Sequence, residues 1–194
     1  TARLVTAIRD STLPAAAIDA IHARSGGNPF FIEELLLGDT DPGLDVRFAP
    51  SLWDILEDRV GGMPAEARVV QGAIAVAGPQ VEDWLVEAVA SLPEQALLAG
   101  LHAGLSAGLL RVMHDGQADR YAFRHPLIGE VVYEGLLATE RRRLHEACAQ
   151  ALADRTGGNR PSVAAHWSEL ARHWQAAGNV ERAFAAAVRA GAEA

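Results

Sequence analysis

Apolar residues recur three and four positions apart along most of the chain, a spacing typical of amphipathic helices. Gly and Pro interrupt the pattern at short intervals, so we expect many short helices rather than a few long ones. Ser51 stands where one of these stretches begins and is suited to cap it. The first part of the chain is expected to form helices around residues 18–22, 29–37, 51–60, 64–77, 81–89 and 93–105.

The spacing of apolar residues along the chain changes after residue 108. Residues 109–113 and 121–123 are short β-compatible runs, and a turn-like segment at residues 114–119 separates them. Two such runs around a turn predict a β-hairpin. Helices followed by a two-stranded hairpin favour a winged-helix domain, and a plain helical bundle with an extended loop is the alternative.

Helical periodicity resumes at Pro126 and continues to the end of the chain. In the last stretch, Val180, Phe184 and Val188 belong to one apolar stripe with Ala183 and Ala187. We expect this stripe to pack on the helix at residues 163–174, with the two alanines allowing close approach. Two antiparallel helices of this kind look like one tetratricopeptide-type hairpin, the first of a helical-repeat array.

Composition excludes several functions. The chain has 194 residues, and its 17 basic residues are all Arg, against 25 acidic residues and a net charge of −8. Without Lys it cannot form an ordinary phosphate-binding P-loop or a Lys Schiff base. The negative charge argues against direct nucleic-acid binding. The single Cys148 permits no internal disulfide, and its place among Leu144 and Leu152 predicts a buried, inert thiol.

No apolar run is long enough to span a membrane, and the start of the chain has no signal-peptide pattern. We therefore expect a soluble, cytoplasmic protein. The chain opens at Thr1 without a Met and stops at Ala194 within a helical pattern, which predicts a piece of a longer protein. The Asp-, Gly- and Pro-rich residues 38–50 are the best candidate for a linker.

Few side chains suggest chemistry. Glu33 and Glu34 are adjacent, point about 100° apart on a helix, and are interpreted as solvated first-turn acids. The His residues are scattered, and His166 and His173 lack a third ligand, so no metal site is expected. His125 is interpreted as a packing residue where the hairpin meets the next helix.

Arg141, Arg142 and Arg143 form the basic cluster, with Arg120 and Arg124 upstream. A winged helix can bind DNA through such a cluster. However, acidic residues interleave with these arginines, and the candidate recognition helix near residues 93–105 contains no Arg. We favour a surface of intramolecular or inter-domain salt bridges.

The segment SGGNPFFIEELL at residues 25–36 resembles the GNPFF-x-EEL block that ends the ATPase module of signal-transduction ATPases with numerous domains. Large ATP-binding regulators of the LuxR family and some multidomain adenylyl cyclases contain this block. The resemblance continues at SLW and the following residues 51–77, at YAFRHPLI in residues 121–128, at RR and LH in residues 141–145, and at AHW and AAGN in residues 165–179. Each piece is weak, but their combined order is specific.

The resemblance implies a helical lid in which Gly27, Asn28 and Pro29 approach the adenine of a bound nucleotide. Pro offers a rigid apolar face, and Gly lets the backbone come close. The structural alternative is a helix C-cap followed by a Pro that begins the next helix. The resemblance divides the chain into a lid-like segment at 1–47, a winged-helix domain at 48–125 and a helical extension at 126–194.

The expected function is therefore regulatory and non-catalytic, in a bacterial ATP-dependent transcriptional regulator of the LuxR family. Such a fragment holds no cofactor of its own, while the parent protein binds ATP or ADP. Its expected partners are the P-loop domain of the same chain and an inducer-binding repeat array, with neither nucleic acid nor membrane. The alternatives are the same module in a multidomain adenylyl cyclase, and a stand-alone protein-interaction module.

Overall fold

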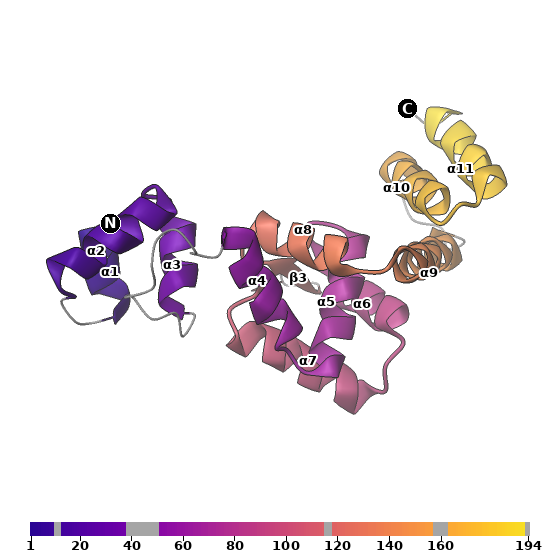
Figure 1. Cartoon of the computed structure of the whole chain (residues 1–194). Coiled ribbons are helices and arrows are strands. Elements are labelled where there is room, and N and C mark those ends of the chain that lie inside the picture. Colours follow the sequence, from indigo (N-terminus) through magenta and orange to yellow (C-terminus); the bar gives the residue numbers. More distant parts are fainter. Residues whose placement is uncertain (10–12, 38–50, 115–117, 157–162, 193–194) are drawn as a thin grey trace. The chain divides into compact units, whose positions relative to one another are not determined.

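The computed structural model describes residues 1–9, 13–37, 51–114, 118–156 and 163–192. The chain is mainly helical with one small antiparallel sheet (Figure 1). Its contacts divide it into two compact units, Thr1–Gly62 and Met63–Ala194. The predicted segments at 1–47, 48–125 and 126–194 stay a prediction, and the predicted linker at 38–50 lies outside the described residues.

The first unit contains four helices in its described residues: α1 (Ala2–Arg9), α2 (Ala15–Ser25), α3 (Pro29–Leu37) and α4 (Leu52–Gly61). Apolar side chains from all four meet in one core, which contains Val5, Ile21, Ile32, Leu35 and Ile55. Ser51 caps α4 as predicted, because its hydroxyl accepts from the Asp54 N–H while the Asp54 carboxylate accepts from the Ser51 N–H.

The second unit is built around α5 (Ala65–Ala77), which contacts α6 (Asp83–Ala90), α7 (Glu94–Ser106), α8 (Pro126–Gly135) and α9 (Ala138–Thr156) (Figure 1). The predicted inward residues of α5 are buried, and Val70, Ala73 and Ile74 are fully inaccessible. Gly100 of α7 permits the close crossing of α7 over α5, since a Cβ there would lie 2.7 Å from the Glu66 carbonyl oxygen.

The predicted hairpin is confirmed as β2 (Leu110–His114) and β3 (Asp119–Phe123), which pair antiparallel with Val112 opposite Tyr121. The helix predicted at residues 81–89 is confirmed as α6, but it begins at Asp83 rather than at residue 81. Val81 and Glu82 form a short strand, β1 (Val81–Glu82), which pairs antiparallel with β3 and completes the order β1-β3-β2. Val81 is buried at this position, so an apolar residue that also fits a helical stripe is used in the sheet instead.

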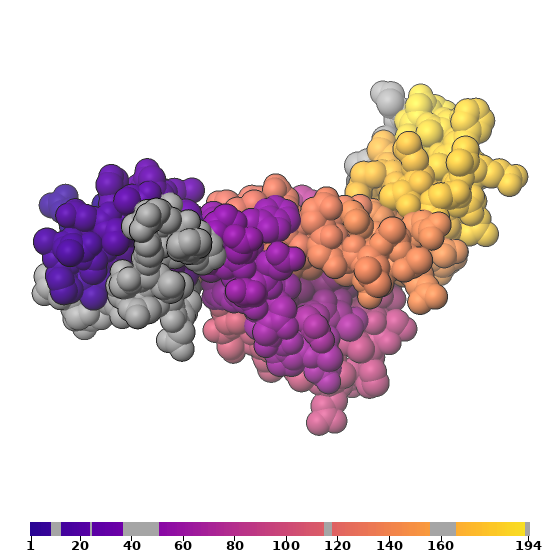
Figure 2. Space-filling view, viewed as in Figure 1, coloured from indigo at the N-terminus to yellow at the C-terminus, as the bar shows by residue number. Residues whose placement is uncertain are grey.

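The last three helices are α9, α10 (Val163–Ala176) and α11 (Val180–Ala192), which form the orange-to-yellow end of the chain in Figure 2. Helix α10 contacts both of its neighbours. Gly178 makes the turn between α10 and α11 with φ 84°, a conformation that favours glycine. A separate core joins the three helices, and it contains Ala149, Leu152, Leu170, Trp174 and Ala186.

The predicted packing face of α11 is confirmed at Ala183, which packs against the core of α9, α10 and α11, but it is wrong for the other four residues of the stripe. Val180, Phe184 and Val188 are 75%, 70% and 55% exposed, and Ala187 is exposed as well. The helix also packs through Ala186, which is 3% exposed. Ala183 and Ala186 allow closer contact with the large rings of α10 than Phe184 would, so the smaller residues form the interface.

Candidate functional site

The predicted site residues lie in the tight connection between α2 and α3. Helix α2 ends at Ser25, and Gly26 follows in the left-handed conformation with φ 57°. Gly27 has φ 80°, which also favours glycine. Asn28 then leads to Pro29 at the first position of α3. The structure therefore places Gly27, Asn28 and Pro29 together at one helix start.

Local hydrogen bonds explain this turn. The Gly27 N–H donates to the Ser25 hydroxyl at 3.2 Å, and the Asn28 N–H donates to the Ser25 carbonyl at 2.9 Å. The Asn28 side-chain oxygen accepts from the Phe30 N–H at 3.0 Å and so caps α3. Pro29 has no backbone N–H, but the first position of a helix offers no intrahelical acceptor for that group, so no hydrogen bond is lost. Capping chemistry alone is thus sufficient to fold this loop.

The outer surface of the loop is available for contact. Asn28 and Pro29 are exposed, whereas Gly27 is half-buried against the His22 ring. A Cβ at Gly27 would lie 3.3 Å from that ring, and His22 is in turn hydrogen-bonded to the Thr1 hydroxyl at 2.6 Å. The loop therefore presents a rigid pyrrolidine face to solvent and has little room for a larger residue at Gly27.

The prediction that Glu34 is a solvated acid was wrong. Glu33 is half-buried, but Glu34 is 3% exposed rather than a solvated acid of the first turn, and its carboxylate accepts from the Arg59 guanidinium of α4. The partner lies 25 residues away along the chain, so no local pattern indicates this ion pair. Loss of Arg59 would leave a buried carboxylate without this partner, which is a strongly destabilising change.

A buried chain of polar groups, which the sequence analysis did not identify, joins four helices of the second unit. The Tyr133 hydroxyl of α8 lies 3.1 Å from His145 Nε2 of α9, and His145 Nδ1 lies 2.9 Å from His173 Nδ1 of α10. His173 Nε2 lies 2.8 Å from a terminal nitrogen of Arg172, which also donates to the Ala77 carbonyl at the end of α5. Both imidazoles are buried.

Arg172 can only donate, while each neutral imidazole donates through one ring nitrogen and accepts through the other. The hydrogen bonds of this chain are therefore coupled through the tautomers of His145 and His173. Both rings are neutral, in agreement with burial and nearby Arg172, which lower the pKa of His145 to about 4 and that of His173 to about 3. The arrangement links α5, α8, α9 and α10 through these polar groups.

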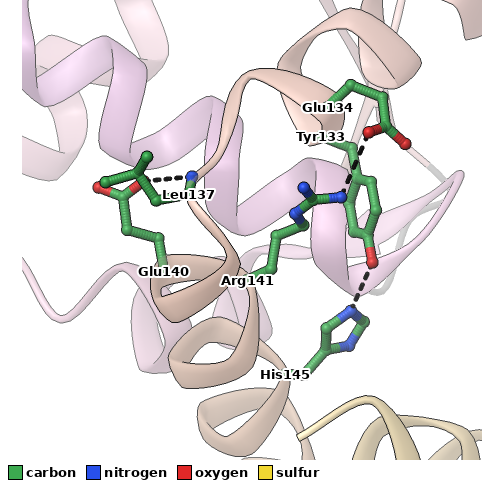
Figure 3. Close-up of polar contacts among 6 residues, drawn as sticks. All are labelled: Tyr133, Glu134, Leu137, Glu140, Arg141 and His145. Carbon is green, nitrogen blue, oxygen red and sulfur yellow. Dashed lines mark hydrogen bonds and ion pairs between the residues drawn. The ribbon is translucent and has the colours of Figure 1, made fainter.

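The arginine cluster makes intramolecular contacts (Figure 3). Arg141 donates to the Glu134 carboxylate at 3.3 Å, and its guanidinium lies 5.3 Å from the centre of the Tyr133 ring. At the start of α9, the Leu137 N–H donates to the Glu140 carboxylate at 2.8 Å. The salt-bridge interpretation is confirmed for Arg141.

The remaining candidates behave as structural residues. The His125 ring accepts from the Leu127 N–H at 3.2 Å and caps α8, so it belongs to the junction between β3 and the next helix. Cys148 is fully buried as predicted, and burial raises its pKa to about 12. Within the described residues, no three His, Cys, Asp or Glu side chains come close enough to hold a metal ion. None of the helices described here has the length and apolarity to cross a bilayer.

Helices α10 and α11 also contain two matched pairs of rings and guanidinium groups. Arg189 lies over Trp167 and Arg182 lies over Trp174, at 4.8 and 4.7 Å from the ring centres. Both tryptophans and both arginines are seven residues apart, and the helices run antiparallel, so each pair occupies the same level of the two helices. The equal spacing was visible in the sequence and could have indicated this register.

Comparisons with known proteins add one relative. No protein-family model matches the chain, and no solved structure does. The chain is 33% identical over 191 residues to an uncharacterized protein of Rhizobium meliloti (strain 1021). The match covers 90% of this chain but 18% of the relative, so the chain spans less than a fifth of the length of the curated relative it matches.

Proposed function

We propose that this chain is a regulatory, non-catalytic segment of a larger ATP-dependent transcriptional regulator, in which it couples nucleotide state to inducer sensing. The observation that carries the proposal is the exposed Pro29 face, held rigidly by the Gly26–Gly27 turn and the Asn28 cap. In the parent protein this face packs on the adenine of ADP. Similarity to a relative about five times as long supports a role within a multidomain chain.

The second unit supports the same assignment. Its elements run α5-β1-α6-α7-β2-β3, with β1 pairing with β3, which is the order of a winged-helix domain. In this proposal the lid contacts the nucleotide bound by the P-loop domain, and α10–α11 is the first hairpin of the repeat array. Helix α7, in the position of a recognition helix, contains no Arg, so we expect no direct DNA binding by this segment.

The test is ADP binding by the full-length parent protein with Pro29→Ala. Removal of part of the pyrrolidine face and loosening of the loop should cost about 1–2 kcal/mol, a five- to thirtyfold weaker affinity for ADP. Weaker ADP binding should also raise activity in the absence of inducer, because the ADP-bound form is the resting state.

Pro126→Ala is the matched control, since Pro126 is also exposed and begins a helix, α8. Both substitutions should lower thermal stability by similar small amounts, whereas only Pro29→Ala should change the Kd for ADP. An unchanged Kd in a folded Pro29→Ala protein would show that the loop is a helix junction without a nucleotide role.

A further inference from the structure

An open groove of about 320 Å³ lies along α9, α10 and α11. Trp167, Leu170 and Trp174 line it from α10, and Ala186 lines it from α11. This volume is at the lower end of the range for small-molecule sites, which are mostly apolar with a few placed polar groups. The groove is thus of a size for a small organic molecule rather than for a helix.

Two positive charges flank this apolar lining. Arg182 and Arg189 both border the groove, and seven residues of helix separate them by about 10 Å along the axis of α11. Each guanidinium is held over a tryptophan ring, which restricts its position before any ligand arrives. Preorganised guanidinium groups of this kind suit carboxylate or phosphate oxygens.

Among the described residues that line the groove, none is acidic. Within the described part of the chain, Arg182 and Arg189 make no ion pair with a carboxylate, and the Arg182 guanidinium donates to the Gln150 side-chain oxygen at 3.4 Å. Asp154 accepts from the Gln150 amide nitrogen at 2.9 Å, which turns the amide oxygen toward Arg182. The residues that line the groove therefore contribute two positive charges and no negative charge, in a chain of net charge −8.

We propose that the groove binds a small organic anion with an extended apolar body and an acidic group at each end. The apolar body lies along the accessible parts of the lining, at Trp167, Ala153 and Ala185, and the acidic groups pair with Arg182 and Arg189. Binding releases Arg182 from its long contact with Gln150 at little cost. The proposal concerns α9–α11 alone and does not depend on a nucleotide role for the loop at Pro29.

Calorimetry on the 194-residue chain tests the proposal with three ten-carbon probes: the dicarboxylate sebacate, the monocarboxylate decanoate and the neutral 1,10-decanediol. We expect sebacate to bind most tightly, decanoate about tenfold more weakly and the diol more weakly again, because each acid adds one charge-assisted contact. Affinity for sebacate should fall as the salt concentration rises.

Variants identify the charges responsible. Arg182→Gln and Arg189→Gln should each weaken sebacate binding by about tenfold, and the double variant should bind sebacate no better than the diol. Arg142→Gln, at an exposed position of α9, is the matched control and should leave the affinity unchanged. Equal binding of the three probes, no binding at millimolar concentrations, or equal effects of all three arginine substitutions would overturn the proposal.

Discussion

Helices α5 and α11 are both 13 residues long and rich in Ala and Val, yet they are used in opposite ways. Helix α5 buries eight residues and is contacted by four other helices. In α11, Ala186 is the one described residue that is fully buried, and the larger apolar side chains face outward. A helix with apolar residues on two sides can pack on either one, and the shape of its neighbour decides which.

The largest expected effect lies in α5. Ile74→Ala should lower the free energy of unfolding by about 3 kcal/mol, because it removes fully buried methyl groups and leaves a cavity. Denaturant titration of the chain measures the change. Val69→Ala on the same helix is the control, since Val69 is 41% exposed and its loss should cost less than about 0.5 kcal/mol. Equal losses for the two variants would show that the buried and exposed faces of α5 contribute equally to stability, contrary to this prediction.

The buried histidines predict a pH dependence. Above pH 7 both rings are neutral in the folded and the unfolded chain, so they contribute no slope. In the unfolded chain both rings take up a proton as the pH falls through 6.5. In the folded chain they take it up only near their lowered pKa values, about 4 for His145 and about 3 for His173. As the pH is lowered below 6.5, the free energy of unfolding should therefore fall by up to about 1.4 kcal/mol per pH unit for each ring.

Denaturant titrations between pH 7 and pH 5 measure this slope, and His145→Gln combined with His173→Gln should flatten it. His102→Gln is the control, because His102 is exposed on α7 and its loss should leave the slope unchanged. Parallel pH profiles for the double variant and the unsubstituted chain would exclude these rings as the cause.

A gain in stability is expected at Gln71 of α5. Its side chain is fully buried, and neither polar atom has a hydrogen-bond partner in the described structure. Gln71→Met keeps the volume and removes the unsatisfied amide, so the free energy of unfolding should rise by about 1 kcal/mol. Gln95→Met at an exposed position of α7 should change little. A clear loss of stability on Gln71→Met would indicate that the amide is satisfied in solution.

The smallest effect is expected on the outer face of α11. Phe184→Ser exchanges residues of similar helix propensity at a position that is 70% exposed, so the free energy of unfolding should change by less than about 0.5 kcal/mol. A loss comparable to that of Ile74→Ala, measured by the same titration, would mean that Phe184 is buried in the folded chain.

Local signals in the sequence predicted the parts of the fold that depend on local interactions. The Ser51 cap, the turn at Gly27 and Asn28 and the hairpin of β2 and β3 each follow from a few adjacent residues. Interactions between distant residues were not predicted. The pairing of Glu34 with Arg59, and of His145 with His173, depends on how whole helices pack.

The most direct test is a measurement of which side of α11 is buried, because the groove and the positions of Arg182 and Arg189 depend on that packing. Ala186→Cys and Ala187→Cys introduce the same thiol at adjacent positions, one 3% exposed and the other exposed. The native Cys148 should not interfere, since it is buried and its pKa is raised to about 12. With a maleimide reagent we expect the Ala187→Cys thiol to react at the rate of a free thiol and the Ala186→Cys thiol at least about tenfold more slowly. The reverse order of rates would show that α11 packs through its Val180–Phe184–Val188 face and that the groove does not exist.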